Sequence, residues 1–262
     1  MAIMSPVMTV MQKAARKAAR ALARDFGEVE QLQVSMKGPA DFVTAADKKA
    51  EQIIFGELSH ARPGYGFLME ESGAVDGPDK SHRWIIDPID GTTNFVHGIA
   101  HYSISIGLER EGQLAAGIVY NPLTDEMFWA EKGQGAFLNN RRLRVSARKN
   151  LNECLLATGI PFHGRKGQKE LIADLNGIMD NVAGIRRFGS AALDLAYVAA
   201  GRFDGYWERG LSPWDIAAGI VLVREAGGLV SGLTKDPVLE TGDILATNAE
   251  IHNAVAALLP KA

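Results

Sequence analysis

The chain has 262 residues, of which 47% are apolar and 23% are charged, and its formal net charge is −3. These values are ordinary for a folded globular protein and give no support to a disordered, collagen-like or coiled-coil chain. Because the charge balance is slightly acidic, it supplies no electrostatic footprint for nucleic acid, and we expect none to be bound.

Cysteine usage and apolar patterning bear on the cellular compartment. Cys154 is the single cysteine, so it cannot form an internal disulfide, and its apolar neighbours favour a buried structural thiol. The N-terminal segment lacks the continuous apolar core of a signal peptide, and no later stretch has the length of a membrane span. We therefore expect a cytoplasmic protein that does not bind membranes.

The first part of the chain is expected to form two helices with an extended segment between them. Apolar residues recur at helical spacing over residues 5–26, and we interpret the basic residues between them as a solvated outer face. Residues 32–37 are expected to form a strand or bend. Thr44 and Asp47 then resemble a capping box, in which side-chain oxygens satisfy the first helical amides, ahead of a helix that reaches about Leu58. Helix capping alone would account for Asp47.

The next segments have the pattern of a sheet. Residues 64–70 are expected to form a strand that ends in acids, and residues 73–80 a polar loop. Residues 84–86 have the aromatic and β-branched character of a short buried strand. Pro88 has no N–H to donate, so we expect it to stop the sheet ladder.

Three further apolar segments separated by turns predict an antiparallel meander, at residues 102–108, 113–120 and 126–131.

The second part of the chain alternates strands with helices. Residues 141–150 are basic and polar and mark the expected boundary between two halves that pack as one structural unit. Residues 1–145 would form an N-terminal α+β half with the antiparallel sheet, and residues 146–262 a C-terminal α/β half. Because helices separate the later strands, some strand pairs should be parallel. The expected strands are 153–158, 185–188, 205–208 and 244–247, and the expected helices are 169–181, 191–200, 214–226 and a short one from Ala249.

Two aspartates follow the buried strand at residues 84–86. Asp87 and Asp90 flank Pro88-Ile89, and Gly91 permits close approach of the backbone to a ligand before Thr92-Thr93-Asn94 opens a helix. Two carboxylates are thus held on a strand-to-helix turn. An isolated Asp-Gly pair is more often an ordinary turn, so other acids decide its interpretation.

Other acids occur at comparable places. Glu70 and Glu71 follow an apolar strand, Asp47 lies three residues after Thr44, and Asp215 opens an apolar helix. Burying such acids costs free energy unless a positive group meets them. Since these segments hold no lysine or arginine except Lys48 and Lys49, a metal ion is the expected counter-charge.

The donor types favour a hard cation. The six histidines show neither the paired spacing of a zinc site nor cysteine partners, whereas oxygen ligands without soft donors favour Mg²⁺. Divalent cations would reverse the repulsion between these carboxylates and a phosphate ester and would lower the pKa of a bound water. The helix start at residues 91–93 would add N–H groups for the phosphate. The residues therefore favour metal-assisted hydrolysis of phosphate esters.

Two motifs carry a resemblance to a known family. Residues 87–95, Asp-Pro-Ile-Asp-Gly-Thr-Thr-Asn-Phe, and residues 214–219, Trp-Asp-Ile-Ala-Ala-Gly, together resemble the paired signature of the inositol monophosphatase family. Glu70-Glu71 and residues 41–47 fall where that family has its other acids, and the resemblance spans nearly the whole chain. It implies a mixed α/β fold, the layered αβαβα sandwich shared with fructose-1,6-bisphosphatase, and also a homodimer and sensitivity to lithium.

The resemblance further implies a set of ligands for two to three Mg²⁺ ions. Glu70, Asp87 and the carbonyl of Ile89 would hold the activating ion. Asp87, Asp90 and Asp215 would hold a second ion that stabilises the leaving alkoxide, and Glu70 would help to place a third.

Catalytic and substrate-binding roles follow from the same resemblance. Thr92, hydrogen-bonded to Asp47, would orient the attacking water, so the implied catalytic residues are Asp47, Glu70 and Thr92. The implied contacts with a small phosphate ester are Asp90, Gly91, Thr92, Ser190, Ala191, Glu208 and Asp215.

Alternative roles stay open for some of these residues. Asp215 could stabilise the dipole of its helix, and Glu208 could be a solvated acid paired with Arg209. An aspartyl-nucleophile phosphatase would need the motif Asp-x-Asp-Gly-Thr, but Asp87 and Asp90 stand one residue too far apart.

The substrate and the partners also have alternatives. Residues 188–192 look like the inositol phosphatase type, yet relatives in the superfamily hydrolyse fructose bisphosphate, histidinol phosphate or nucleotide-linked phosphates. Some bacterial relatives serve transcription and ribosomal RNA maturation, so a partner in the transcription machinery is a further hypothesis.

Overall fold

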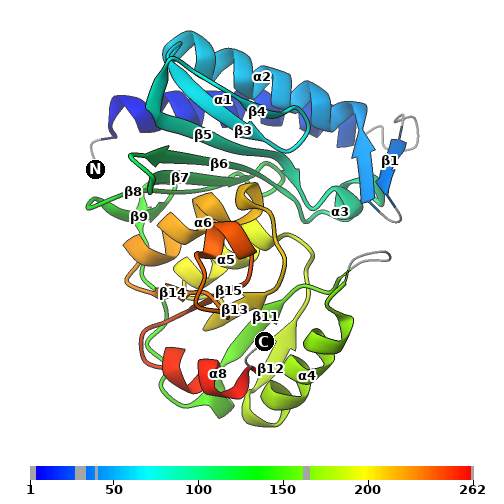
Figure 1. The fold of residues 1–262 in the computed structure, drawn as a ribbon, viewed down its shortest axis with the longest axis vertical. Helices are drawn as coiled ribbons and strands as arrows, with labels where there is room; N and C mark the ends of the chain where they lie inside the picture. The colour runs from blue at the N-terminus through cyan, green and yellow to red at the C-terminus, as the bar shows by residue number, and fades with distance from the viewer. Residues whose placement is uncertain (1–3, 27–33, 39–40, 162–165, 261–262) are drawn as a thin grey trace.

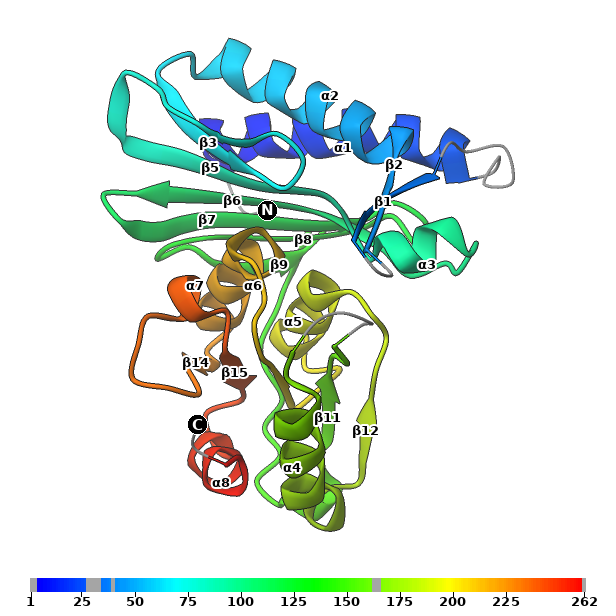
Figure 2. The ribbon, with the colours of Figure 1, turned by 45° about the vertical axis from the view of Figure 1, so that its right-hand side comes forward.

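The structure is a computed structural model that describes residues 4–26, 34–38, 41–161 and 166–260. Its elements stack in five layers of alternating helices and sheets (Figures 1 and 2). Helices α1 and α2 cover an eight-stranded sheet, α5 and α6 lie between that sheet and a five-stranded one, and α4 and α8 cover the far side. The predicted αβαβα sandwich is therefore confirmed.

The first helical layer consists of α1 (Pro6–Phe26) and α2 (Ala45–Ala61), connected through the antiparallel hairpin of β1 (Val34–Gly38) and β2 (Asp41–Thr44). The inner face of α1 is rich in alanine, which lets the helix lie close to its neighbours. Residues 32 and 33 of the expected strand lie outside the described residues. On the outer face, Lys13 and Lys17 pair with Glu57 and Arg16 pairs with Asp125, so acids neutralise much of the basic run.

The eight-stranded sheet has the order β10-β9-β8-β7-β6-β5-β3-β4, and all its pairs are antiparallel except β3 with β5. Its strands are β3 (Tyr65–Met69), β4 (Gly73–Val75), β5 (Asp79–Asp90), β6 (Ser103–Arg110), β7 (Gln113–Asn121), β8 (Glu126–Glu131), β9 (Gly135–Leu138) and β10 (Arg141–Arg142). The predicted meander is confirmed as β6 to β8.

Two expectations about this sheet were wrong. Residues 73–80 are not a continuous loop, since they include β4 and the start of β5. Pro88 does not end the ladder either, because β5 resumes its pairing with β6 at Asp90↔Ser103. The register shifts between Asp87 and Asp90, so Pro88 sits in an irregularity where its missing N–H leaves no ladder bond broken.

Between the sheets lie α5 (Ala191–Ala199) and α6 (Pro213–Glu225). The paired residues Gly107 and Gly117 on β6 and β7 let α6 approach the large sheet closely. A Cβ atom on Gly117 would lie 2.6 Å from the carbonyl oxygen of Ala218, and one on Gly107 would lie 3.0 Å from the Cβ of Ala217. The glycine pair thus fixes the depth at which the start of α6 meets the sheet.

The five-stranded sheet has the order β12-β11-β13-β15-β14. Its strand β11 runs parallel to both β12 and β13, which confirms the expectation that some pairs would be parallel. Its strands are β11 (Leu155–Thr158), β12 (Gly184–Arg186), β13 (Gly205–Glu208), β14 (Leu229–Ser231) and β15 (Ile244–Thr247). Glu153 belongs to a short 3-10 turn, η2 (Leu151–Glu153), rather than to β11, and Phe188 lies beyond the end of β12.

The remaining helices are α3 (Thr92–Val96), α4 (Gln168–Ile178) followed by the 3-10 turn η3 (Met179–Asn181), α7 (Val238–Thr241) and α8 (His252–Leu258). The described strands of the large sheet end at residue 142 and those of the small sheet begin at residue 155. The division of the chain into halves at residue 145 stays a prediction. Over the described ranges, no helix combines the length and apolar character needed to cross a membrane.

Candidate active site

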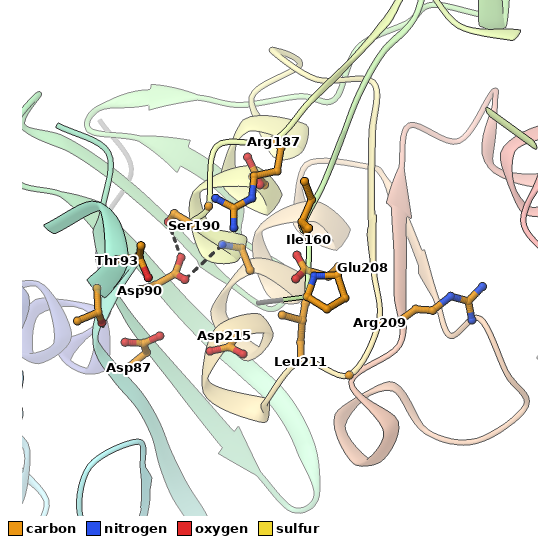
Figure 3. Close-up of a pocket in the computed structure, with 18 of the residues that line it drawn as sticks. Asp87, Asp90, Thr93, Ile160, Arg187, Ser190, Glu208, Arg209, Leu211 and Asp215 are labelled. Carbon is orange, nitrogen blue, oxygen red and sulfur yellow. Dashed lines mark hydrogen bonds between the residues drawn. The ribbon is translucent and has the colours of Figure 1, made fainter. Parts of the chain in front are cut away.

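A cavity of about 540 Å³ lies where the end of β5 meets α5, α6 and β13 (Figure 3). The large sheet supplies one wall, and the C-terminal elements supply the other. All the predicted site residues except Asp47 line this cavity, namely Glu70, Asp87, Ile89, Asp90, Gly91, Thr92, Ser190, Ala191, Glu208 and Asp215.

Asp87 and Asp90 stand at the irregular end of β5. Asp87 is 2% exposed, and its Oδ1 accepts a hydrogen bond of 2.9 Å from the backbone N–H of Ile89, which holds the turn in shape. Gly91 follows with φ of 99°, and a Cβ there would lie 3.1 Å from the carbonyl oxygen of His101. A glycine is therefore required for the chain to turn from β5 into α3.

Asp90 also caps a helix from the other half of the chain. Its carboxylate accepts hydrogen bonds from the backbone N–H of Ala191 at 3.2 Å and from the hydroxyl of Ser190 (Figure 3). It also accepts one from the N–H of Ala192 at 2.8 Å. Burial raises the pKa of Asp90 to about 6, against the opposing effect of these three hydrogen bonds. The side chain thus joins the large sheet to the start of α5.

Asp215 occupies the first turn of α6. Its Oδ2 accepts a hydrogen bond of 2.8 Å from the N–H of Ser212, as in a capping box, so the helix-start role that the sequence suggested is present. The same side chain lines the cavity. Burial, and then the negative charge of Asp90, raise its pKa well above the ordinary value.

Asp47 lies behind the cavity wall and reaches it through Thr92. Its Oδ2 accepts hydrogen bonds from the N–H of Thr44 at 2.7 Å and from the Thr44 hydroxyl at 2.6 Å, which confirms the predicted capping box. The Thr92 hydroxyl lies 3.2 Å from Oδ1 of Asp47 and 2.9 Å from the carbonyl oxygen of Ile89. Since a hydroxyl carries one proton, it donates to one of these two acceptors at a time. Burial raises the pKa of Asp47 to about 6.

The acids around the cavity repel one another. Burial raises the pKa of Asp87 well above its ordinary value, and the negative charges of Glu70, Asp90 and Asp215 raise it further. Within the described ranges, no three acid, histidine or cysteine side chains form a ready-made metal-binding group. The acids nevertheless share one cavity and repel one another. Oxygen donors under such repulsion suit a hard divalent cation, which supplies the missing positive charge.

Glu208 forms the opposite wall at the end of β13. Its Oε2 accepts a hydrogen bond from the hydroxyl of Tyr206. A Cβ atom on Gly159 would lie 2.0 Å from its Cδ, so the absence of a side chain at residue 159 makes room for the carboxylate. Arg209, which the sequence suggested as its partner, also lines the cavity, but its guanidinium points away from the carboxylates (Figure 3) and binds Asp174 on α4 through two hydrogen bonds of 2.9 and 2.8 Å.

The cavity is also lined by three charged residues that the sequence analysis did not assign to the site, namely Lys166, Arg187 and Asp194. Arg187 directly precedes the segment at residues 188–192. Asp194 lies four residues after Ser190, and this spacing places both on one face of a helix. That spacing was the available signal for Asp194.

Comparisons with known proteins extend over the whole chain. The model of the inositol monophosphatase family matches residues 3–262. The chain is 56% identical to the inositol-1-monophosphatase of Mesorhizobium japonicum over 258 residues, which cover 98% of this chain and 97% of that protein. It is 43% identical to the Nus factor SuhB of Escherichia coli strain K12 over 255 residues, which cover 97% of this chain and 96% of that protein.

The fold is also shared with solved structures. The crystal structure of the extragenic suppressor protein suhB from Bartonella henselae superposes with a TM-score of 0.95 at 55% identity, and the match covers 98% of this chain and 99% of that one.

Proposed function

This chain belongs to the inositol monophosphatase family, and from that premise we propose that it hydrolyses inositol monophosphate with Mg²⁺ ions held in the acidic cavity. That it is an inositol-phosphate phosphatase, and so a hydrolase, follows from the family match and from close relatives named inositol-1-monophosphatase. The observation that carries the proposal is the convergence of Asp87, Asp90 and Asp215 on one cavity although they come from distant parts of the sequence.

The family is generally metal-dependent, and we propose two to three Mg²⁺ ions per site, as the resemblance implies; the oxygen donors of the cavity are of the type that Mg²⁺ prefers. The proposed ligands are Glu70, Asp87, Asp90, Asp215 and the carbonyl oxygen of Ile89. When bound, Mg²⁺ neutralises the phosphate and lowers the pKa of a water molecule so that it can attack.

Thr92 and Asp47 would orient that water. With its proton donated to Oδ1 of Asp47, the Thr92 hydroxyl offers a lone pair toward the cavity and can accept a hydrogen bond from water. Asp47 is held by the N–H and the hydroxyl of Thr44, so the acceptor cannot swing away. Its pKa of about 6 suits a group that takes up a proton near neutral pH.

The alcohol part of the substrate would lie against the C-terminal wall. There the Ser190 hydroxyl, through its lone pairs, and the Glu208 carboxylate would accept hydrogen bonds from the ring hydroxyls. Ala191 lines the same wall, and Asp90 and Asp215 would lie beside the leaving oxygen. Gly91 and Thr92 line the phosphate side. This placement leaves the phosphate between the two walls.

The proposal is tested with the purified full chain and a substrate panel. We expect turnover of inositol monophosphate that depends on Mg²⁺ and stops with a chelator, and slower turnover of fructose 1,6-bisphosphate, histidinol phosphate and nucleotide-linked phosphates. Rapid turnover of one of those esters beside none of inositol monophosphate would contradict the choice of substrate. Lithium should inhibit.

The variant Asp87→Asn removes the charge shared by both proposed ions. We expect it to lower kcat at least about 10³-fold while thermal melting shows an intact fold, because removing a buried repulsive charge does not destabilise the metal-free protein. Asp79→Asn, at the exposed start of the same strand, is the matched control and should keep normal activity. An active Asp87→Asn enzyme would refute the ligand assignment.

We also propose a homodimer in the cytoplasm. The side chains of Ile99 and Phe188 are apolar yet 52% and 40% exposed. Stacking on the buried Phe203 and contact with His101 hold the Phe188 ring in place at the surface. The buried Cys154 suits a reducing compartment. Sedimentation of the wild type beside Phe188→Asp tests the dimer, and a monomeric wild type would rule it out.

A second candidate role is a contact with the transcription machinery, which the relative named Nus factor SuhB favours. Such a contact should not depend on catalysis. Pull-down from cell extract with the Asp87→Asn variant separates the two roles, since a scaffold keeps its partner when turnover is lost.

A further inference from the structure

Helix α5 carries a buried acid for which the proposed mechanism has no use. Asp194 is 1% exposed, and over the described part of the chain its Oδ1 has no hydrogen-bond partner. The residue lines the same cavity as Ser190 and Glu208. Buried carboxyl oxygens without a partner are costly and rare in folded proteins, so this one requires an explanation.

Other buried acids of this chain have their partners. Asp204 accepts hydrogen bonds from the Ser146 hydroxyl, the Arg148 guanidinium and the N–H of Leu155. Asp174 likewise holds Arg209 through both of its oxygens. Both oxygens of Asp204 and of Asp174 are thus occupied, whereas Oδ1 of Asp194 has no partner over the described residues.

The surroundings of Asp194 restrict what its partner can be. The nearby acids, half-buried Glu208 and buried Asp90, are negative, and the positive charge that acts on Asp194 comes from Arg187, which is exposed to solvent. A second anionic group on a ligand would meet repulsion at this wall. A hydroxyl group suits it, because a hydroxyl donates to a carboxylate and accepts from a protonated carboxyl equally well.

We propose that Asp194 is a specificity-determining residue that hydrogen-bonds a hydroxyl of the substrate's alcohol, beside the hydroxyl held by Glu208. The residue then selects the monophosphates of neutral polyols over phosphate esters without hydroxyls. This inference rests on the proposed function and assigns the substrate class for the same cavity.

The experiment compares kcat/KM for inositol monophosphate with kcat/KM for p-nitrophenyl phosphate, whose leaving group carries no hydroxyl beyond the ester oxygen. In Asp194→Leu, which has similar volume but no polar atom, the ratio of the two values should fall at least about tenfold, chiefly through KM for inositol monophosphate. Asp194→Asn keeps one acceptor and one donor and should restore the ratio to within about threefold of the wild type.

A control variant separates specificity from stability. Asp204→Asn disturbs a buried acid outside the cavity, so it should lower the melting temperature and leave the substrate ratio unchanged. Should Asp194→Leu fail to fold, Asp194→Ala takes its place with the same expected fall in the ratio.

Two results overturn the inference. They are an unchanged ratio in the folded Leu or Ala variant, and an equal loss on both substrates, which is what a merely structural role gives. Failure of the proposed function looks different, because the wild type itself would then leave inositol monophosphate intact in the presence of Mg²⁺.

Discussion

Two acids of the cavity, and Asp47 behind its wall, also cap helices. Asp47 accepts hydrogen bonds at the start of α2, Asp215 does so at the start of α6, and Asp90 does so across the chain at the start of α5. Backbone N–H groups thereby hold each of these carboxylates in place. A fixed carboxylate loses little conformational entropy when it binds an ion. Capping and ion binding are therefore compatible roles, although the sequence presented them as alternatives.

A prediction at the residue scale concerns Gly159, which leaves room for Glu208. In Gly159→Ala the new Cβ would stand 2.0 Å from the Cδ of Glu208, so the carboxylate must leave its place and its hydrogen bond from Tyr206. Loss of one hydrogen bond to a charged group should raise KM for inositol monophosphate about tenfold with little change in kcat.

The matched control for that variant is Gly56→Ala. Gly56 lies in α2, and apart from its chain neighbours and the backbone of its own helix no atom lies within 4 Å of the place that a Cβ would take there. Alanine should therefore leave KM unchanged and stabilise the helix slightly. Steady-state kinetics of both variants decide the matter, and an unaltered KM in Gly159→Ala would show that Glu208 does not hold the substrate.

Local sequence patterns indicated the individual site residues but not their partners. Periodicity and turn chemistry indicated the three aspartates as candidate site residues, because each follows an apolar run or opens a helix: Asp87, Asp90 and Asp215. The pairing of Arg209 with Asp174 instead depends on how α4 packs beside β13, and adjacency in sequence suggested Glu208. Partners chosen by tertiary packing cannot be derived from neighbouring residues.

At the scale of elements, the docking of α6 on the large sheet determines where Asp215 lies. Gly107 and Gly117 face each other on β6 and β7 and form a flat site for Ala217 and Ala218. The sequence predicted the helix and both strands. It did not reveal that these glycines pair, because strand register is set by long-range contacts. For the same reason the continuation of β5 through Pro88 was missed.

A graded pair of variants at Gly117 tests this docking. Gly117→Ala and Gly117→Val place increasing volume against the backbone of Ala218, so α6 must shift. We expect each to lower the free energy of unfolding, by about 1–3 kcal/mol for valine, and to weaken Mg²⁺ binding as Asp215 is displaced. Gln113→Val, exposed on the same strand, should change stability by less than about 0.5 kcal/mol.

Denaturant titration and Mg²⁺ titration of these variants measure both effects. If a destabilised Gly117→Val protein kept its full affinity for Mg²⁺, the position of α6 would not determine ion binding, and the prediction would be wrong.

At the scale of the whole molecule, the cavity belongs to neither sheet alone. The large sheet and its turn provide Asp87, Asp90 and Thr92, and the elements after residue 150 provide Ser190 and Asp215. The layered sandwich itself was predicted from the family resemblance. Local periodicity gave an antiparallel meander and crossover units, but it left open how the two sheets stack around α5 and α6, since that depends on contacts between distant segments.

Assembly of repelling acids at this junction predicts how stability responds to pH and metal. The pKa values of Asp47 and Asp90 are raised to about 6, above the ordinary 3.8. Their contribution to stability is therefore full below about pH 4 and is lost as the pH rises through about 6 in the absence of metal. The half-buried His101 and the buried His252, with pKa values lowered by burial, act in the opposite direction, because they disfavour folding as the pH falls through 6.5.

The difference in melting temperature with and without Mg²⁺ removes the histidine contribution, because that contribution is common to both measurements. Ions compete with protons for the carboxylates, so the gain should be close to zero at pH 5 and reach about 5 °C at pH 7.5 when Mg²⁺ is in about 100-fold excess over its Kd. Sodium chloride at equal ionic strength should give no such gain, and Asp87→Asn should reduce it. A gain that is the same at both pH values would mean that Mg²⁺ stabilises the protein at a place other than these buried acids.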